Sequence, residues 1–214
     1  MERRTDSLYR CISNSRYTPY LLAKKIGATA ILESASFAKG RERYSILMTE
    51  EAFKIRQDDD GIFFIIDGKE IRFDEKLLAG EKSLDALGRE KSSDILDALL
   101  YVARQNSQPE GKLSDLPLPA SGLGYLSYEF AKHCDNIRFF EQKDELNIPE
   151  SLFVTGHIYI IFDHFTEEIH IFALNYNEHQ IDLNAAMEKL LKKLNNMDFS
   201  YLEEEEQKFD YKML

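Results

Sequence analysis

The feature that most constrains the fold is a series of short apolar segments in residues 43–73, separated by turn sequences. The segments are rich in β-branched and aromatic residues, which favour strands. Asp-Asp-Asp-Gly at 58–61 and Asp-Gly at 67–68 lie between them and suit tight hairpin turns. We therefore predict an antiparallel meander with strands over residues 44–48, 53–56, 62–66 and 70–73. The unbroken apolar run at 62–66 predicts a strand that is covered on both faces.

Elsewhere the apolar spacing predicts helices that pack on this sheet. Thr18 and Pro19 suit the start of a helix, because threonine caps an unpaired amide and proline has none, and Gly27 suits its end. Helices are predicted over residues 20–26, 95–102 and 178–194, and further strands over 8–12, 29–32, 122–127, 153–162 and 168–174. In the second helix, Leu96 and Leu100 belong to the apolar stripe. The last two strands are expected to form a hairpin. The fold class is α+β, a mostly antiparallel sheet flanked by helices.

Charge and composition restrict the partners. The 214 residues include 27 Lys and Arg against 38 Asp and Glu, a formal charge of −11, which argues against binding nucleic acid or an anionic membrane. No apolar run reaches the roughly 18 residues of a membrane span, and no secretory signal is recognisable. We expect a cytoplasmic chain with one domain over residues 1–200, a linker at 107–119 within it, and an acidic linker or tail at 201–214. Cys11 and Cys134 are expected to be reduced, buried thiols without a metal-binding pattern.

Several motifs with chemical potential have a simpler structural explanation. Gly-Leu-Gly at 122–124 lacks the third glycine of a dinucleotide-binding fingerprint, so close backbone approach within a sheet is favoured. The spacing of His157, His164 and His170 does not bring them together as zinc ligands. Asp163 before His164 could be a base beside its orienting group, but an aspartate that caps a turn next to a surface histidine is favoured.

Glu33 and Ser34 are the more informative pair, because they follow directly on an apolar strand. A carboxylate and a hydroxyl just past a buried strand can present a hydrogen-bond acceptor and a donor at the edge of a cleft. Such a pair suits an amino group or an indole N–H of a ligand. The alternative is that these polar residues simply end the strand.

Further motifs occur in the order typical of one enzyme family. They are Thr18-Pro19, Ile31-Leu32-Glu33-Ser34, Arg43-Tyr44-Ser45-Ile46-Leu47, Gly122-Leu123-Gly124-Tyr125-Leu126-Ser127-Tyr128-Glu129, Ile148-Pro149-Glu150 and Ile161-Phe162-Asp163-His164. With them the chain resembles the N-terminal domain of anthranilate synthase component I and of its relative aminodeoxychorismate synthase component I, both chorismate-binding enzymes. Ile31 stands where the family usually has leucine.

The resemblance implies a ligand site and partners. In tryptophan-regulated members the serine of the second motif and its neighbours bind the inhibitor, which implies Glu33 and Ser34 here, with Tyr44 and Ser45 as further candidates. The opposite wall of that pocket, the chorismate site, the Mg²⁺ site and the catalytic residues belong to a second domain, expected beyond Leu214. The resemblance thus implies no catalytic residue and no cofactor in this chain, Mg²⁺ in the missing catalytic domain, and a glutamine amidotransferase subunit as a partner.

Two kinds of function remain open from the sequence. The first is a regulatory and scaffold domain, inactive by itself, of a lyase under feedback inhibition. That lyase is anthranilate synthase, which turns chorismate and ammonia or glutamine into anthranilate and pyruvate in tryptophan biosynthesis, or aminodeoxychorismate synthase of folate biosynthesis. Glu33 in place of aspartate favours the former. The second is a stand-alone binding or interaction module, whose uncovered apolar sheet face would drive self-association.

Overall fold

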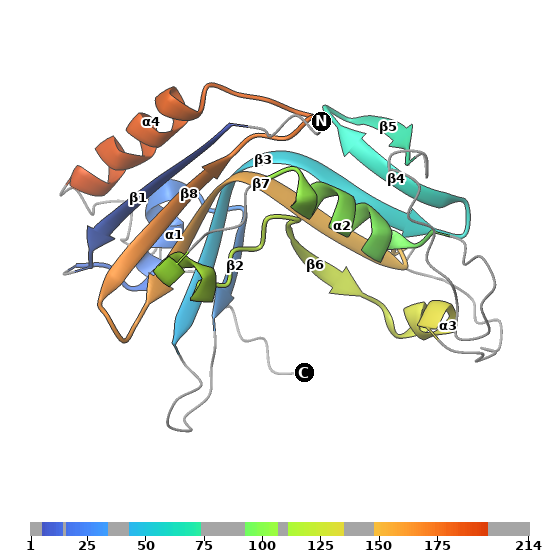
Figure 1. Cartoon of the computed structure of the whole chain (residues 1–214), viewed down its shortest axis with the longest axis horizontal. Coiled ribbons are helices and arrows are strands. Elements are labelled where there is room, and N and C mark those ends of the chain that lie inside the picture. Colours follow the sequence, from blue (N-terminus) through green and yellow to red (C-terminus); the bar gives the residue numbers. More distant parts are fainter. Residues whose placement is uncertain are drawn as a thin grey trace, which may run out of the picture.

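The computed structural model of the chain describes residues 6–14, 16–33, 43–73, 93–106, 111–134 and 148–196. In these segments the chain forms an eight-stranded sheet with helices packed on it (Figure 1). The strands are β1 (Ser7–Ser13), β2 (Ala30–Glu33), β3 (Tyr44–Asp58), β4 (Gly61–Ile66), β5 (Lys69–Arg72), β6 (Leu123–Leu126), β7 (Ser151–Asp163) and β8 (Glu168–Leu174). The helices are α1 (Pro19–Ile26), α2 (Ile95–Arg104), α3 (Ala131–Cys134) and α4 (Leu183–Asn195), with 3₁₀ turns η2 (Gly111–Asp115) and η3 (Tyr128–Phe130). Every strand pair is antiparallel, so the predicted α+β class is confirmed.

β3 and β7 form the centre of the sheet. The strand order is β1-β8-β7-β3-β4-β5, while β2 pairs with the first part of β3 and β6 with the first part of β7. Each central strand is long enough to have different neighbours at its two ends. The sheet therefore extends in two directions, with β1 and β8 at one end of Figure 1 and β4 and β5 at the other. The predicted late hairpin is β7–β8, and it is confirmed.

β3 is one strand of 15 residues where the sequence predicted two. Its register with β7 shifts between Glu51 and Phe53, and Glu50 has a φ of 55°. This β-bulge bends the strand without ending it. Because the bulge contains polar residues, the sequence pattern resembles that of a turn between two strands. Gly156 lies opposite Glu51, and a Cβ at Gly156 would meet Cγ of Met48 at 2.4 Å. The side chain of Met48 thus occupies the space that a side chain at position 156 would need.

The predicted turns of the meander are confirmed. Asp58 faces Gly61 across the β3–β4 hairpin. Between β4 and β5, Asp67 and Gly68 have φ values of 50° and 75°. A type I′ turn, whose twist matches that of the flanking strands, needs this left-handed conformation at both positions.

Residues on the central strands alternate between two cores, because successive side chains of a strand point to opposite faces. On β7, Ile158 and Ile160 join the core beneath α1 and α4, whereas Tyr159 and Ile161 join the core beneath α2. The α1–α4 core also contains Leu22, Ile26, Leu47, Phe162, Ile169, Ile171, Met187 and Leu190. The α2 core also contains Met48, Phe53, Ile55, Ile95, Leu99, Val102, Phe172 and Tyr176. Both faces are therefore covered where the two cores overlap, at residues 47–48 of β3 and 158–161 of β7.

The predicted helix positions are partly corrected. α1 has Thr18 as its N-cap and Gly27, at φ 71°, as its C-cap, as expected. α4 begins at Leu183 after the N-cap Asp182, not near residue 178. The side chain of Asn175 explains the later start, since it binds both the N–H and the carbonyl of Ile181 and holds this segment in a loop. The predicted linker at 107–119 contains η2. No helix in the described segments is long and apolar enough to cross a bilayer.

Three expectations about burial are wrong. Leu96 and Leu100 of α2 are 44% and 45% exposed, because the sheet contacts a narrower stripe of this helix than the apolar pattern indicates. In β4 only Ile62 and Phe64 are buried, since the opposite face of this strand is only partly covered. Cys11 is exposed because it lies on β1, the edge strand of the sheet beside β8.

Candidate functional site

The end of β2 lies beside the start of β3. Glu33 faces Ser45 in the antiparallel register, so the two side chains point to the same face of the sheet. Glu33 is exposed, whereas Ser45 is 4% exposed, and its Oγ lies 2.9 Å from Nε2 of His164. The structure therefore brings together two of the four residues predicted to bind an effector. Ser34 lies outside the described segments.

Tyr44 points to the opposite face, because it precedes Ser45 in the strand. It packs against the α2 core, and the guanidinium of Arg43 lies 4.8 Å from the centroid of its ring. Burial raises the pKa of the Tyr44 hydroxyl, although the charge of Arg43 opposes the shift. Among the described residues this hydroxyl has no hydrogen-bond partner. The sheet thus separates Tyr44 from Glu33 and Ser45, and its role in effector binding stays a prediction.

Asp163, at the end of β7, binds the side chain of Arg43 and the backbone of the turn that follows the strand. Arg43 donates from Nη2 to Oδ2 at 2.7 Å, and Oδ1 accepts from the N–H of Phe165 at 3.0 Å and of Thr166 at 3.4 Å. Burial alone would raise the pKa of Asp163, but these hydrogen bonds outweigh it, so the pKa lies below its ordinary value. His164 is exposed, and the described segments show no hydrogen bond between His164 and this carboxylate. The predicted turn cap beside a surface histidine is therefore confirmed.

The edge of β2 is open in the described part of the chain. β2 pairs with β3 alone there, and its apolar side chains Ile31 and Leu32 are 38% and 51% exposed. Ile31 lies on the same face as Glu33, since residues two apart in a strand share a face. An apolar side chain, an exposed carboxylate and the Ser45–His164 pair thus form one wall of a potential site. This wall offers a negative charge beside an apolar surface, whereas the hydroxyl of Ser45 is buried and is not presented to a substrate.

The Gly-Leu-Gly sequence at the start of β6, residues 122–124, has a structural role. A Cβ at Gly124 would meet the carbonyl oxygen of Leu152 at 2.1 Å, and one at Gly122 would meet that of Val154 at 2.5 Å. Both contacts are with β7, the partner of β6. The glycines thus permit close backbone approach within the sheet, as expected.

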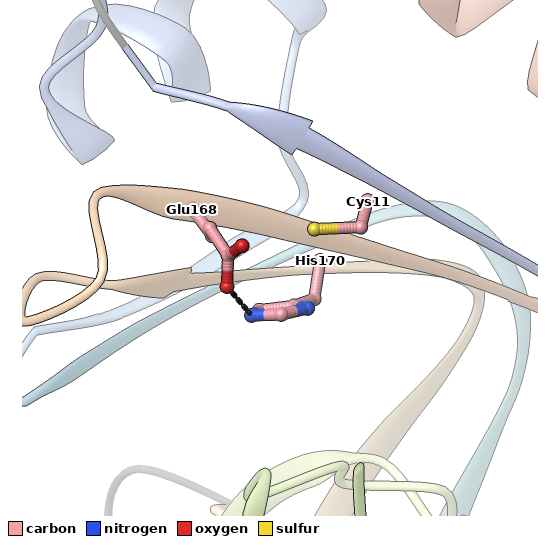
Figure 2. Close-up of side chains that lie close together, drawn as sticks. All are labelled: Cys11, Glu168 and His170. Carbon is pink, nitrogen blue, oxygen red and sulfur yellow. Dashed lines mark ion pairs between the residues drawn. The ribbon is translucent and has the colours of Figure 1, made fainter. Parts of the chain in front are cut away.

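Sequence reasoning missed a cluster of three side chains with metal-ligating atoms. Cys11, Glu168 and His170 lie together on β1 and β8, with their ligand atoms within 4.8 Å of one another (Figure 2). The spacing of the histidines gave no hint, because the ligands come from strands that are far apart along the chain. The only available signal was that Glu168 and His170, two residues apart on one strand, share a face.

Known proteins include ones that are similar to this chain in sequence or in structure. No known family model matches the chain. Over 198 residues, 92% of the chain, the sequence is 40% identical to anthranilate synthase component 1 from Spirochaeta aurantia.

The chain is related to anthranilate synthase component I.

The resemblance predicted from the sequence motifs is thereby confirmed. The chain spans 37% of the length of this curated relative. A crystal structure of anthranilate synthase component I from Streptococcus pneumoniae TIGR4 aligns with 90% of this chain and 38% of its own, with 20% identity and a TM-score of 0.49.

Proposed function

We propose that the chain is the N-terminal regulatory and scaffold part of anthranilate synthase component I and binds an amino-acid effector of the tryptophan type at Glu33, Ser34 and Ser45. In the whole enzyme, chorismate and ammonia from a glutamine amidotransferase subunit would give anthranilate and pyruvate. The catalytic part and its Mg²⁺ would lie outside this chain. The sequence identity with the Spirochaeta aurantia enzyme supports the family side of the proposal.

The edge of β2, which has no further strand partner in the described segments, is the observation that carries the regulatory role. Glu33 is an exposed carboxylate next to a buried serine, and Ile31 on the same face is left partly exposed. A carboxylate attracts the ammonium group of an amino acid, and an apolar surface suits a large side chain. A single wall cannot exclude water, so a second wall from the catalytic part would complete the pocket.

The same geometry supports a non-catalytic role for this chain. In the described segments, Asp163 is held by Arg43 and by turn amides, and Ser45 is hydrogen-bonded to an exposed histidine. Ser45 does lie beside an imidazole, but its side chain is buried, so its hydroxyl is not presented to a substrate. The chain by itself is therefore expected to have no turnover.

The test is reconstitution of the enzyme from parts. The chain is combined with the remaining part of the Spirochaeta aurantia component and an amidotransferase subunit, and anthranilate fluorescence is followed with chorismate, Mg²⁺ and glutamine. We expect no signal from the chain alone, a signal from the combination, and its decrease when tryptophan is added. Formation of aminodeoxychorismate instead of anthranilate would move the chain to the folate branch, and turnover by the chain alone would refute the scaffold role.

The effector site is tested by substitution in the same assay. Glu33→Gln removes the charge that would bind the ammonium group, so the tryptophan concentration for half-inhibition should rise by about tenfold or more, since a hydrogen bond to a charged group contributes about 1.5–3 kcal/mol. Glu188→Gln, an exposed position on α4, is the matched control and should leave inhibition unchanged. Equal inhibition of both variants would contradict the assignment of Glu33.

A further inference from the structure

Cys11, Glu168 and His170 share one face at the edge of the sheet. Cys11 of β1 stands directly opposite His170 of β8, and Ser13 stands opposite Glu168. Because residues two apart on a strand point the same way, Glu168 and His170 flank the same side as Cys11. This side belongs to the α2 core, since Phe172, two residues further along β8, packs there. It is the opposite face of the sheet from Glu33 and Ser45.

The ligand atoms lie nearly at the spacing of a metal site. They are all within 4.8 Å of one another, and Nε2 of His170 is 3.7 Å from Oε2 of Glu168 (Figure 2). A tetrahedral zinc ion binds sulfur at about 2.3 Å and nitrogen or oxygen at about 2.0–2.1 Å, which places its ligand atoms about 3.3–3.6 Å apart. Small rotations of the Cys11 and Glu168 side chains would close the remaining gap.

The imidazole of His170 is held in the orientation that a ligand needs. The side chain of His170 is 8% exposed, and its Nδ1 lies 2.9 Å from the hydroxyl of Tyr9. The rings of Tyr9 and His170 are stacked, with 14° between their planes. With Nδ1 engaged by Tyr9, Nε2 is left on the side of Glu168. Metal-binding histidines are positioned in this way by a partner on their second nitrogen.

The ion would have a way in and a suitable set of donor atoms. Cys11 is exposed and the side chain of Glu168 is 43% exposed, so the site opens to solvent on the side away from the buried His170. Thiolate, imidazole and carboxylate together suit zinc, whereas Mg²⁺ prefers oxygen donors alone. The Mg²⁺ of the proposed whole enzyme therefore does not fit here.

We propose that Cys11, Glu168 and His170 bind a zinc ion that ties the edge strand β1 to β8. Three protein ligands leave the fourth position of the ion to water. Tyr9 is a positioning residue, which holds the imidazole of His170 without touching the metal. This site is independent of the proposed effector site, which uses other residues on the other face.

Cobalt(II) is the probe for the test, because its thiolate complexes have a charge-transfer band and tetrahedral geometry gives strong visible bands. The full chain is freed of metal with a chelator and titrated with cobalt, then with zinc. We expect the wild-type chain to develop both signals and zinc to abolish them. Zinc should also raise the thermal unfolding midpoint, because it binds the folded state. No thiolate band with excess cobalt would overturn the proposal and leave an ordinary ion pair between Glu168 and His170.

Four variants locate the ligands. Cys11→Ser, at an exposed position, should lose the thiolate band and the thermal shift by zinc, whereas Cys134→Ser, the matched control, should keep both. Glu168→Gln should weaken cobalt binding by tenfold or more. Tyr9→Phe should weaken it by about 10-fold to 100-fold, the range for partners that orient a ligand. A band that survives in Cys11→Ser, or is lost only in Cys134→Ser, would refute the assignment.

Discussion

Nε2 of His157 lies 2.7 Å from Nδ1 of His179, in a contact between β7 and the segment before α4. Nδ1 of His157 lies 2.7 Å from the carbonyl oxygen of Leu174. Since a carbonyl only accepts, Nδ1 of His157 carries a hydrogen and Nε2 accepts from His179. Burial is the largest reason that the pKa of His157 lies below its ordinary value, and His179 lowers it further, while Leu174 and Glu50 oppose the shift.

The histidine pair predicts stability that depends on pH. Because the pKa of His157 is lower in the folded than in the unfolded chain, the unfolded chain takes up this proton first as the pH falls. The free energy of unfolding should therefore decline below about pH 6.5, the ordinary histidine value, until His157 is protonated in the folded chain as well. Denaturant unfolding at about pH 7.5 and about pH 5.5 measures the effect. His157→Gln should reduce the decline, whereas His164→Gln, at an exposed site, should not; an unchanged decline in His157→Gln would contradict the assignment.

Removal of the charge of Asp163 should destabilise the chain. Asp163 is 3% exposed and accepts from Arg43 and from the turn amides, so Asp163→Asn places an amide N–H₂ against a guanidinium. We expect a loss of about 1–3 kcal/mol in the free energy of unfolding near pH 7, from one buried polar group left unsatisfied. The loss should shrink at acidic pH, because the lowered pKa of Asp163 gives stability that is present above the unfolded value and lost as the pH falls through the folded one. Asp67→Asn, in an exposed turn, is the control and should be nearly neutral.

Added methyl groups at two strand glycines should test the close packing around β7. Gly156→Ala would press on Cγ of the fully buried Met48, and we expect a cost of about 1–3 kcal/mol from overpacking. Gly124→Ala should cost more, since its Cβ would meet backbone of Leu152, which cannot rotate away. Urea unfolding of each variant measures the change. Gly68→Asn, at a left-handed turn position with open space, should be tolerated; equal losses in all three would disprove the packing explanation.

The capping box of α2 should contribute measurably to stability. The Asp94 carboxylate accepts from the N–H of Leu96 at 2.9 Å, and Asp97 accepts in return from the N–H of Asp94 at 3.0 Å. Asp94→Ala should lower the free energy of unfolding by about 1 kcal/mol, whereas Asp94→Asn should retain most of it, because asparagine is an equally good cap. Thermal unfolding followed by circular dichroism compares the two. A loss of the same size in both variants would show that the charge matters and the hydrogen bond does not.

The candidate site shows where sequence reasoning was only partly right. Glu33 was singled out as a polar residue just past a buried strand, but it is the last residue of β2, and the other residues of this strand are exposed or half-buried. The partner of Glu33 could be named only through resemblance to a family, because the register of β2 on β3 decides that Ser45 lies beside it. The same register and the pleat of β3 place Tyr44 on the other face, which a list of neighbouring residues could not reveal.

Local chemistry is what the sequence by itself determined. Thr18, Pro19 and Gly27 set the limits of α1, and Asp67 with Gly68 makes a hairpin, because each effect acts within a few residues of the chain. Tertiary structure alone decided which distant strands pair. It brings Cys11 against His170, merges two predicted strands into β3, and delays α4 through the side chain of Asn175. These outcomes depend on the total apolar surface that the whole sheet buries, and no local sequence pattern determines that total.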